Sequence, residues 1–121
     1  MGHIHQLVKL SADKVVTVRM LVDTGATFSV IPDALARAVG IKRLRRSVVV
    51  TLADGRRVKL DAGVAIFRIE GREAPATILV GDVEEPILGV ETLEALGLTV
   101  DTRKRRLAPS RHYAVRLGSY R

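Results

Sequence analysis

Positions 20–32 of the chain read Met-Leu-Val-Asp-Thr-Gly-Ala-Thr-Phe-Ser-Val-Ile-Pro. Three apolar residues precede Asp23, which predicts a buried strand that delivers one carboxylate at its end. Gly25 allows the chain to turn tightly where a side chain would collide with its surroundings, and the hydroxyl of Thr24 can form a hydrogen bond across a contact. These residues therefore predict a loop that holds one carboxylate rigidly at the base of a cleft.

A second segment downstream has a similar order of features. Positions 76–81 read Ala-Thr-Ile-Leu-Val-Gly, and positions 85–98 read Glu-Pro-Ile-Leu-Gly-Val-Glu-Thr-Leu-Glu-Ala-Leu-Gly-Leu. Both segments combine a strand, a loop with glycine, an apolar pair and a short helix, once around 25–40 and again around 81–97. This similarity suggests an internal repeat.

Together, the two segments resemble the active-site loop and the second signature of the aspartic proteases, in particular the single-domain retroviral-type enzymes (retropepsins) and their cellular relatives. The resemblance covers roughly Val16 to Leu107. It implies an all-β, single-domain acid-protease fold, a closed β-barrel with one or two short helices, that forms a homodimer. Residues 1–121 would then be one domain, with a core at about 15–108 and a basic C-terminal tail at 109–121.

The chemistry of this family explains why a homodimer is expected. Peptide hydrolysis by carboxylates needs two of them sharing one proton, because like charges a few ångströms apart cannot both ionise. One carboxylate activates a water and the other polarises the scissile carbonyl. The chain has one Asp-Thr-Gly, and its other aspartates lie at turns, caps or strand ends without a similar frame. A catalytic site therefore requires a twofold dimer in which each chain contributes Asp23.

The resemblance also implies roles for the neighbouring residues. Thr24 would hydrogen-bond across the twofold axis beneath the dyad, the Gly25 carbonyl would accept a hydrogen bond from the substrate backbone, and Ala26 would line the subsite floor. Three residues of the second segment would pack behind the active-site loop: Ile87, Leu88 and Gly89.

A hairpin is predicted at Asp54-Gly55, a strong tight-turn signal between two strand-like runs. By resemblance this hairpin would be the flap that closes over substrate and excludes water. Its tip comprises Leu52, Ala53, Asp54 and Gly55. These residues carry charge and less glycine than the viral flap.

Two positions depart from the retroviral pattern. In retroviral enzymes, Asp-Thr-Gly-Ala is often followed by a second aspartate, and the second glycine by an arginine that pairs with it. Thr27 and Val90 occupy these positions here. Because both charged partners are absent together, no buried charge is left unpaired.

The remaining elements are predicted from hydrophobic periodicity and turn residues. Short helices are expected at 33–39 and 91–96, each ended by a glycine. Residues 42–46 are expected to be a basic linker, and the strand at 57–69 is expected to break near Ala62-Gly63. The other strands are expected at 4–10, 15–22, 48–52, 74–80, 98–101, 105–108 and 112–117.

Composition narrows the functional classes. The chain has no cysteine, which excludes disulfides and thiolate chemistry. His3 and His5 alternate on one strand but lack an evident third ligand, so no metal or cofactor is expected. The apolar runs are too short to cross a membrane, and the N-terminus lacks a signal-peptide pattern. We therefore expect a cytoplasmic protein without a membrane partner.

The net charge of +7 is compatible with nucleic-acid binding or with a solvated basic surface. With two Phe, two Tyr and no Trp, the chain has too few aromatic residues for a base-stacking platform. Nucleic acid is therefore not expected as a partner. The leading hypothesis is an aspartic endopeptidase acting on peptide or protein substrates. The alternatives are a catalytically weak dimer that binds or scaffolds peptides on the same fold, and a basic nucleic-acid-associated domain.

Overall fold

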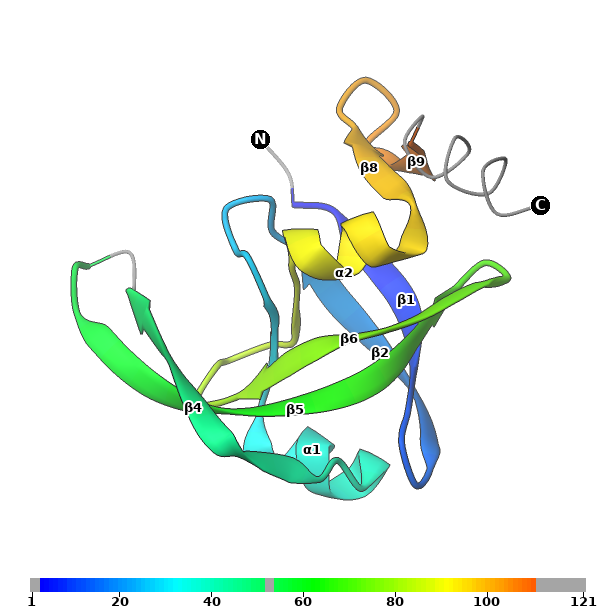
Figure 1. Ribbon diagram of the computed structural model, residues 1–121. Helices are drawn as coiled ribbons and strands as arrows, with labels where there is room; N and C mark the ends of the chain where they lie inside the picture. Colours follow the sequence, from blue (N-terminus) through cyan, green and yellow to red (C-terminus); the bar gives the residue numbers. More distant parts are fainter. Residues whose placement is uncertain (1–2, 52–53, 111–121) are drawn as a thin grey trace, which may run out of the picture.

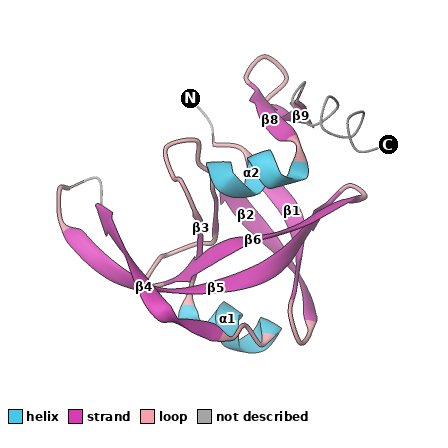
Figure 2. Cartoon of the chain, viewed as in Figure 1, coloured by secondary structure: helices cyan, strands magenta, loops and turns pink. Residues whose placement is uncertain are grey.

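The computed structural model describes residues 3–51 and 54–110, and these residues fold into a mostly β structure with two short helices (Figures 1 and 2). Neither helix in this part of the chain has the length or apolar run needed to cross a membrane. In chain order the elements are β1 (His5–Ser11), β2 (Val15–Val22), β3 (Ser29–Ile31), α1 (Asp33–Val39), β4 (Arg43–Thr51), β5 (Arg57–Ile69), β6 (Arg72–Val80), β7 (Ile87–Leu88), α2 (Val90–Leu96), β8 (Leu98–Asp101) and β9 (Arg106–Pro109).

Seven strands form one sheet in the order β1-β2-β7-β3-β6-β5-β4. Strand β1 also pairs with β5, from Lys9 opposite Arg68 to Ser11 opposite Ile66. The pairings therefore run from β1 through β2, β7, β3, β6 and β5 and return to β1, with β4 attached outside this ring. The two helices lie on opposite sides of the strands, and the β4–β5 hairpin extends away from the body (Figure 1).

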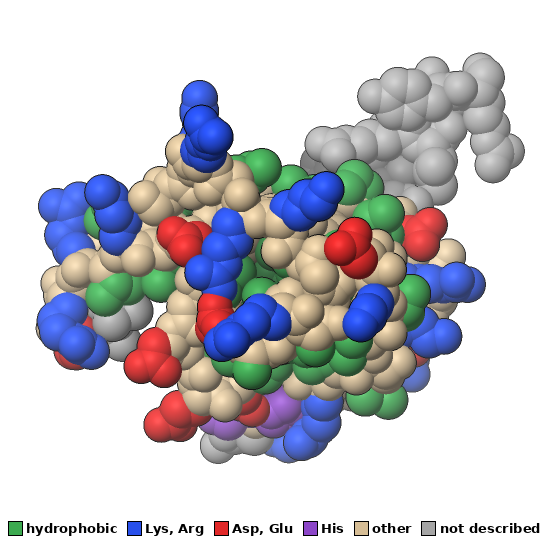
Figure 3. All heavy atoms as spheres, turned by 90° about the horizontal axis from the view of Figure 1, so that it is seen from below, with side chains coloured by type: hydrophobic (Ala, Val, Ile, Leu, Met, Phe, Trp, Pro, Cys, Tyr) green, Lys and Arg blue, Asp and Glu red, His purple; other side chains and the backbone are tan. Residues whose placement is uncertain are grey.

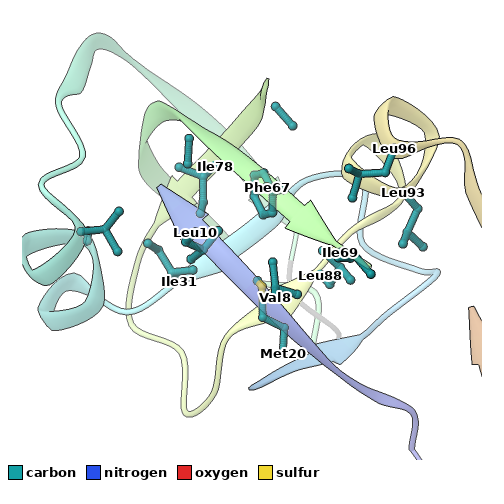
Figure 4. Packing of buried hydrophobic residues seen from close by; sticks show 14 of the residues in the cluster. Val8, Leu10, Met20, Ile31, Phe67, Ile69, Ile78, Leu88, Leu93 and Leu96 are labelled. Carbon is teal, nitrogen blue, oxygen red and sulfur yellow. The ribbon is translucent and has the colours of Figure 1, made fainter. Parts of the chain in front are cut away.

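The main core lies among the strands of the ring and includes side chains from both helices (Figure 4). Alternate residues of β1 point inward, as expected for a strand with one solvated face. Burial of these apolar side chains is the main stabilising term of the fold. The labelled residues of this core are Val8, Leu10, Met20, Ile31, Phe67, Ile69, Ile78, Leu88, Leu93 and Leu96.

Strand β5 changes the face that it buries halfway along its length. Its exposed residues have odd numbers before Ala62 and even numbers after Gly63, and these two consecutive residues are both buried. A Cβ on Gly63 would lie 2.7 Å from the Ile41 side chain and 2.9 Å from the Lys42 carbonyl. The predicted break here is wrong, because the pairing with β6 is continuous. The first half of β5 instead covers a second apolar cluster, and the second half covers the main core. The buried residues of this second cluster are Val30, Ala62 and Leu79.

The predicted basic linker at 42–46 is also wrong, since β4 begins at Arg43. Arg43 forms ion pairs with Asp33 and, at 3.0 Å, with Asp61, which holds this end of β4 against α1 and β5. The register between β4 and β5 shifts between Arg43 and Ser47. Charged side chains and a register shift are common on edge strands, because they discourage pairing with other chains. The charges therefore mark a sheet edge rather than a connection.

The helix ends and the turns follow the local turn residues. Helix α1 spans the predicted 33–39, and α2 begins one residue earlier than predicted; both end at a glycine in the left-handed conformation, Gly40 and Gly97. Glu70 and Gly71 both have positive φ, which is the two-residue hairpin turn suited to twisted strands. The strands predicted at 98–101 and 105–108 are present as β8 and β9, which pair in antiparallel orientation. The strand predicted at 112–117 lies outside the described residues.

Replacement of Phe67 by alanine is predicted to destabilise the protein by about 3–5 kcal/mol, because it leaves a cavity in the main core. Urea unfolding at fixed chain concentration, followed by circular dichroism, measures the free energy of unfolding. Val64→Ala on the same strand is the control, since Val64 is 48% exposed and should change stability by less than about 0.5 kcal/mol. Equal effects of the two substitutions would contradict the assignment of the core.

Candidate active site

The site lies where two halves of the chain meet. The first half contributes β2, β3 and α1, and the second half contributes β6, β7 and α2. Strand β2 pairs in parallel with β7, and β3 pairs in parallel with β6, so the first strand of each half pairs with the second strand of the other. Strands β3 and β7 then meet in antiparallel orientation at Val30 and Ile87. The loop after β2 and the segment after β7 are therefore held side by side.

Asp23 follows β2 directly and is fixed at three points. Its backbone N–H donates to the Leu88 carbonyl at 3.0 Å, and its own carbonyl accepts from Ala26 N–H at 3.1 Å. Its carboxylate oxygen Oδ1 accepts from Gly25 N–H at 2.9 Å. Both the backbone and the side chain of Asp23 are thus oriented by main-chain donors and acceptors, which have little freedom to move.

The same loop closes the start of α2. The carbonyls of Ala26 and Thr27 accept hydrogen bonds from the N–H groups of Val90 and Glu91, at 2.8 and 2.9 Å. Helix N-termini leave such N–H groups without intrahelical partners, and α2 has no side-chain cap. The loop that carries Asp23 therefore supplies the backbone cap of this helix.

Gly89 permits this close approach. A Cβ at this position would lie 2.5 Å from the backbone carbonyl carbon and oxygen of Phe28, and 2.9 Å from the carbonyl oxygen of Ala26. Since these neighbours are backbone atoms in an interlocked loop, they cannot yield as the end of a side chain can. The sequence therefore needs glycine here for packing.

A cleft with a volume of about 620 Å³ opens above Asp23. Strand β4 and the neighbouring part of β5 line one side, and the second apolar cluster lines the base. Among the described residues that line the cleft, Asp23 is the one with an ionisable side chain. The lining residues are Asp23, Gly25, Ala26, Thr27, Phe28, Val30, Val48, Val49, Val50, Thr51, Leu60, Leu79, Val83 and Ile87.

The other predicted site residues lie around this cleft. Thr24 is exposed at the tip of the loop, while Leu88 and Gly89 are buried behind it. The predicted flap is the far end of the β4–β5 hairpin, which remains paired as far as Thr51 opposite Arg57. Of its tip, Asp54 and Gly55 are exposed, and Leu52 and Ala53 lie outside the described residues.

Hydrogen bonds from Arg56 stabilise the charged form of Asp54. The backbone N–H and guanidinium of Arg56 donate to its carboxylate at 2.9 and 2.7 Å, and these bonds lower the pKa of Asp54 below its ordinary value. Because the pKa is lowered, the stabilisation from this interaction is fully present when the pH is above the ordinary pKa of aspartate. It is lost as the pH falls through the lowered pKa of Asp54. The hairpin turn therefore retains this ion pair in mildly acidic solution.

Sequence reasoning missed a buried hydroxyl pair beneath the site. Ser29 and Thr92 are both 0% exposed, and their oxygens lie 2.6 Å apart. Ser29 Oγ also accepts a hydrogen bond from Gly89 N–H at 3.0 Å. The available signal was Ser29 itself, a hydroxyl directly before the apolar pair Val30-Ile31, in a strand buried along its whole length.

Other candidate sites receive less support from the geometry. Among the described residues there is no group of three or more His, Cys, Asp or Glu side chains that could hold a metal. On the face seen in Figure 3, Lys and Arg side chains are interspersed with Asp and Glu. This distribution is typical of a solvated surface rather than of a basic binding patch.

A family model of known proteins matches most of the chain. The family described as "gag-polyprotein putative aspartyl protease" matches residues 8–95, a span that includes Asp23 and the second segment as far as Ala95. The chain therefore belongs to this family of retropepsin-like aspartic proteases. No curated protein matches the sequence.

The fold matches that of a solved retroviral protease. The structure of EIAV protease complexed with the inhibitor HBY-793 superimposes with a TM-score of 0.67 and 23% sequence identity, covering 83% of this chain and 93% of that chain. The prediction was an all-β acid-protease fold with one or two short helices, and the acid-protease fold is confirmed as mostly β with few helices.

Gly89→Ala is predicted to destabilise the protein by about 1–3 kcal/mol or more, because the added methyl group meets the backbone of Phe28. Gly81→Ala is the matched control. Its methyl group would meet the end of the Leu60 side chain at 2.5 Å, and that side chain can rotate away. Thermal unfolding of both variants at equal concentration provides the measurement. An unfolding temperature for Gly89→Ala at or above that of Gly81→Ala would refute the tight packing of the two segments.

Proposed function

We propose that the chain is an aspartic endopeptidase that hydrolyses peptide bonds through a dyad of Asp23 residues from two identical subunits. The observation that carries this proposal is the setting of Asp23, which is fixed by backbone hydrogen bonds at the base of a mostly apolar cleft. Membership of the aspartyl protease family and the retroviral protease fold support it.

The second carboxylate must come from a second copy of the chain. The described cleft contains one ionisable side chain, whereas the reaction needs two carboxyl groups that share a proton. Thr24 and Gly25 are exposed at the loop tip, so a symmetry-related loop can approach them. In this proposal each subunit is a closed β-barrel formed by the ring of strand pairings, and Thr24 hydrogen-bonds across the twofold axis.

The dyad would act as a combined general acid and base. The ionised carboxylate accepts a proton from a water, whose oxygen attacks the scissile carbonyl carbon. The protonated carboxyl donates its proton to the carbonyl oxygen, which gives a tetrahedral intermediate. The intermediate collapses as the C–N bond breaks. The leaving nitrogen takes a proton from one carboxyl group, and the other carboxylate takes the proton of one hydroxyl of the intermediate, which yields the carboxylic acid and restores the single shared proton of the dyad. The Gly25 N–H on Asp23 Oδ1 orients one carboxylate oxygen throughout.

The cleft would bind substrate through apolar side chains and backbone contacts. Its apolar walls fit apolar substrate side chains, and the carbonyl of Gly25 is proposed to accept a hydrogen bond from the substrate backbone. The β4–β5 hairpin is proposed to close over the bound peptide and exclude water.

Asp23→Asn is predicted to lower peptide hydrolysis by about 10²–10⁴-fold or more, because an amide cannot give and take a proton. One substitution replaces both members of the dyad. The assay uses a mixed peptide library from acidic to neutral pH, and sedimentation should show that parent and variant are both dimers. Asp82→Asn, on an exposed loop, is the control and should retain activity.

Retained activity in purified Asp23→Asn would mean that the catalytic group lies elsewhere. A parent protein that stays monomeric throughout the active concentration range would exclude the shared site. A parent that dimerises and binds peptides but cleaves none would favour the scaffolding function.

A further inference from the structure

We infer that Ser29 and Thr92 are positioning residues for Asp23, acting through the peptide bond between Leu88 and Gly89. The inference rests on the proposed function, since it assigns to this hydroxyl pair the alignment of the proposed catalytic carboxylate. Neither hydroxyl lines the cleft, so neither touches substrate.

One peptide unit links the hydroxyl pair to Asp23. The carbonyl of Leu88 accepts the hydrogen bond from Asp23 N–H, and the N–H of Gly89 donates to Ser29 Oγ. This carbonyl and this N–H belong to the same peptide bond, whose atoms lie in one plane. A rotation of the plane that breaks one hydrogen bond therefore disturbs the other. Ser29 Oγ thus fixes the orientation of the carbonyl on which Asp23 rests.

Thr92 in turn fixes the hydroxyl of Ser29. The two oxygens are 2.6 Å apart, a short distance even for a hydroxyl pair. Both side chains are 0% exposed, so water does not compete for these bonds. The Gly89 N–H engages one lone pair of Ser29 Oγ. The contact with Thr92 then restrains the remaining rotation of the Ser29 hydroxyl.

The two ends of this contact are themselves held in place. Ser29 lies in β3, opposite Ile78 of β6, and Thr92 lies in the first turns of α2, whose N-terminus is capped by the Asp23 loop. The hydroxyl pair therefore joins the strand after the active-site loop to the helix of the second segment. A displacement of about 1 Å at a reacting group can cost 10²-fold in rate, and in a homodimer both carboxylates would move.

Two substitutions at Thr92 separate its hydroxyl from its methyl group. Thr92→Val keeps the shape and removes the hydroxyl, whereas Thr92→Ser keeps the hydroxyl and removes the methyl group. We expect Thr92→Val to lower kcat by about 10-fold or more with little change in KM, and Thr92→Ser to stay within about threefold of the parent. If Thr92 only packed against its neighbours, Thr92→Ser would lower kcat more than Thr92→Val.

Amide hydrogen exchange followed by NMR provides a readout that does not require activity. Exchange at Asp23 and Gly89 should be faster in Thr92→Val than in Thr92→Ser by about tenfold. The amide of Phe67, in the main core, is the reference for global opening and should exchange alike in both variants.

Equal kcat and equal exchange at Asp23 in the two variants would overturn the inference. So would faster exchange in Thr92→Val that extends to Phe67, because it would report general destabilisation. If the parent protein hydrolyses no peptide, the proposed function fails separately. In that case the amide exchange rate at Asp23 decides whether the hydroxyl pair positions this loop. A rate that rises in Thr92→Val at Asp23 but not at Phe67 supports the inference.

Discussion

The hydrogen bond from Asp23 N–H to the Leu88 carbonyl joins the two halves of the chain at the point where each half leaves its strand. Parallel pairing of β2 with β7 brings these two groups together. The backbone bonds from the loop to Val90 and Glu91 then continue the contact into α2. The absence of a side chain at Gly89 makes this approach possible. The carboxylate is consequently held by the topology of the whole chain rather than by one turn.

The cleft follows from the way in which β5 serves two clusters. Its second half closes the main core, while its first half pairs with β4 beyond the ring and covers the second cluster at the base of the cleft. The β4–β5 hairpin extends away from the body (Figure 1). Its partly buried residues Val48, Val50 and Leu60 pack on the second cluster rather than on the main core. Such a hairpin can move without exposing the core, which suits an element that is proposed to open and close over a peptide.

Features encoded by a few adjacent residues were predictable from the sequence. The Asp-Thr-Gly motif gave the candidate site, and Gly40 and Gly97 gave the ends of the helices. Features that depend on distant partners were not. Arg43 pairs with Gly63 of β5 and its side chain contacts Asp33 and Asp61, and Ser29 is satisfied by groups about 60 residues away. Periodicity alone contains no information about such contacts.

The central claim is that two chains share one catalytic site. Titration calorimetry of the parent protein with a peptide that carries a hydroxyethylene group in place of the scissile amide tests it directly, since such a group resembles the tetrahedral intermediate. The account predicts one inhibitor bound per two chains, because a twofold dimer has a single cleft between its carboxylates. Saturation at one inhibitor per chain would contradict it.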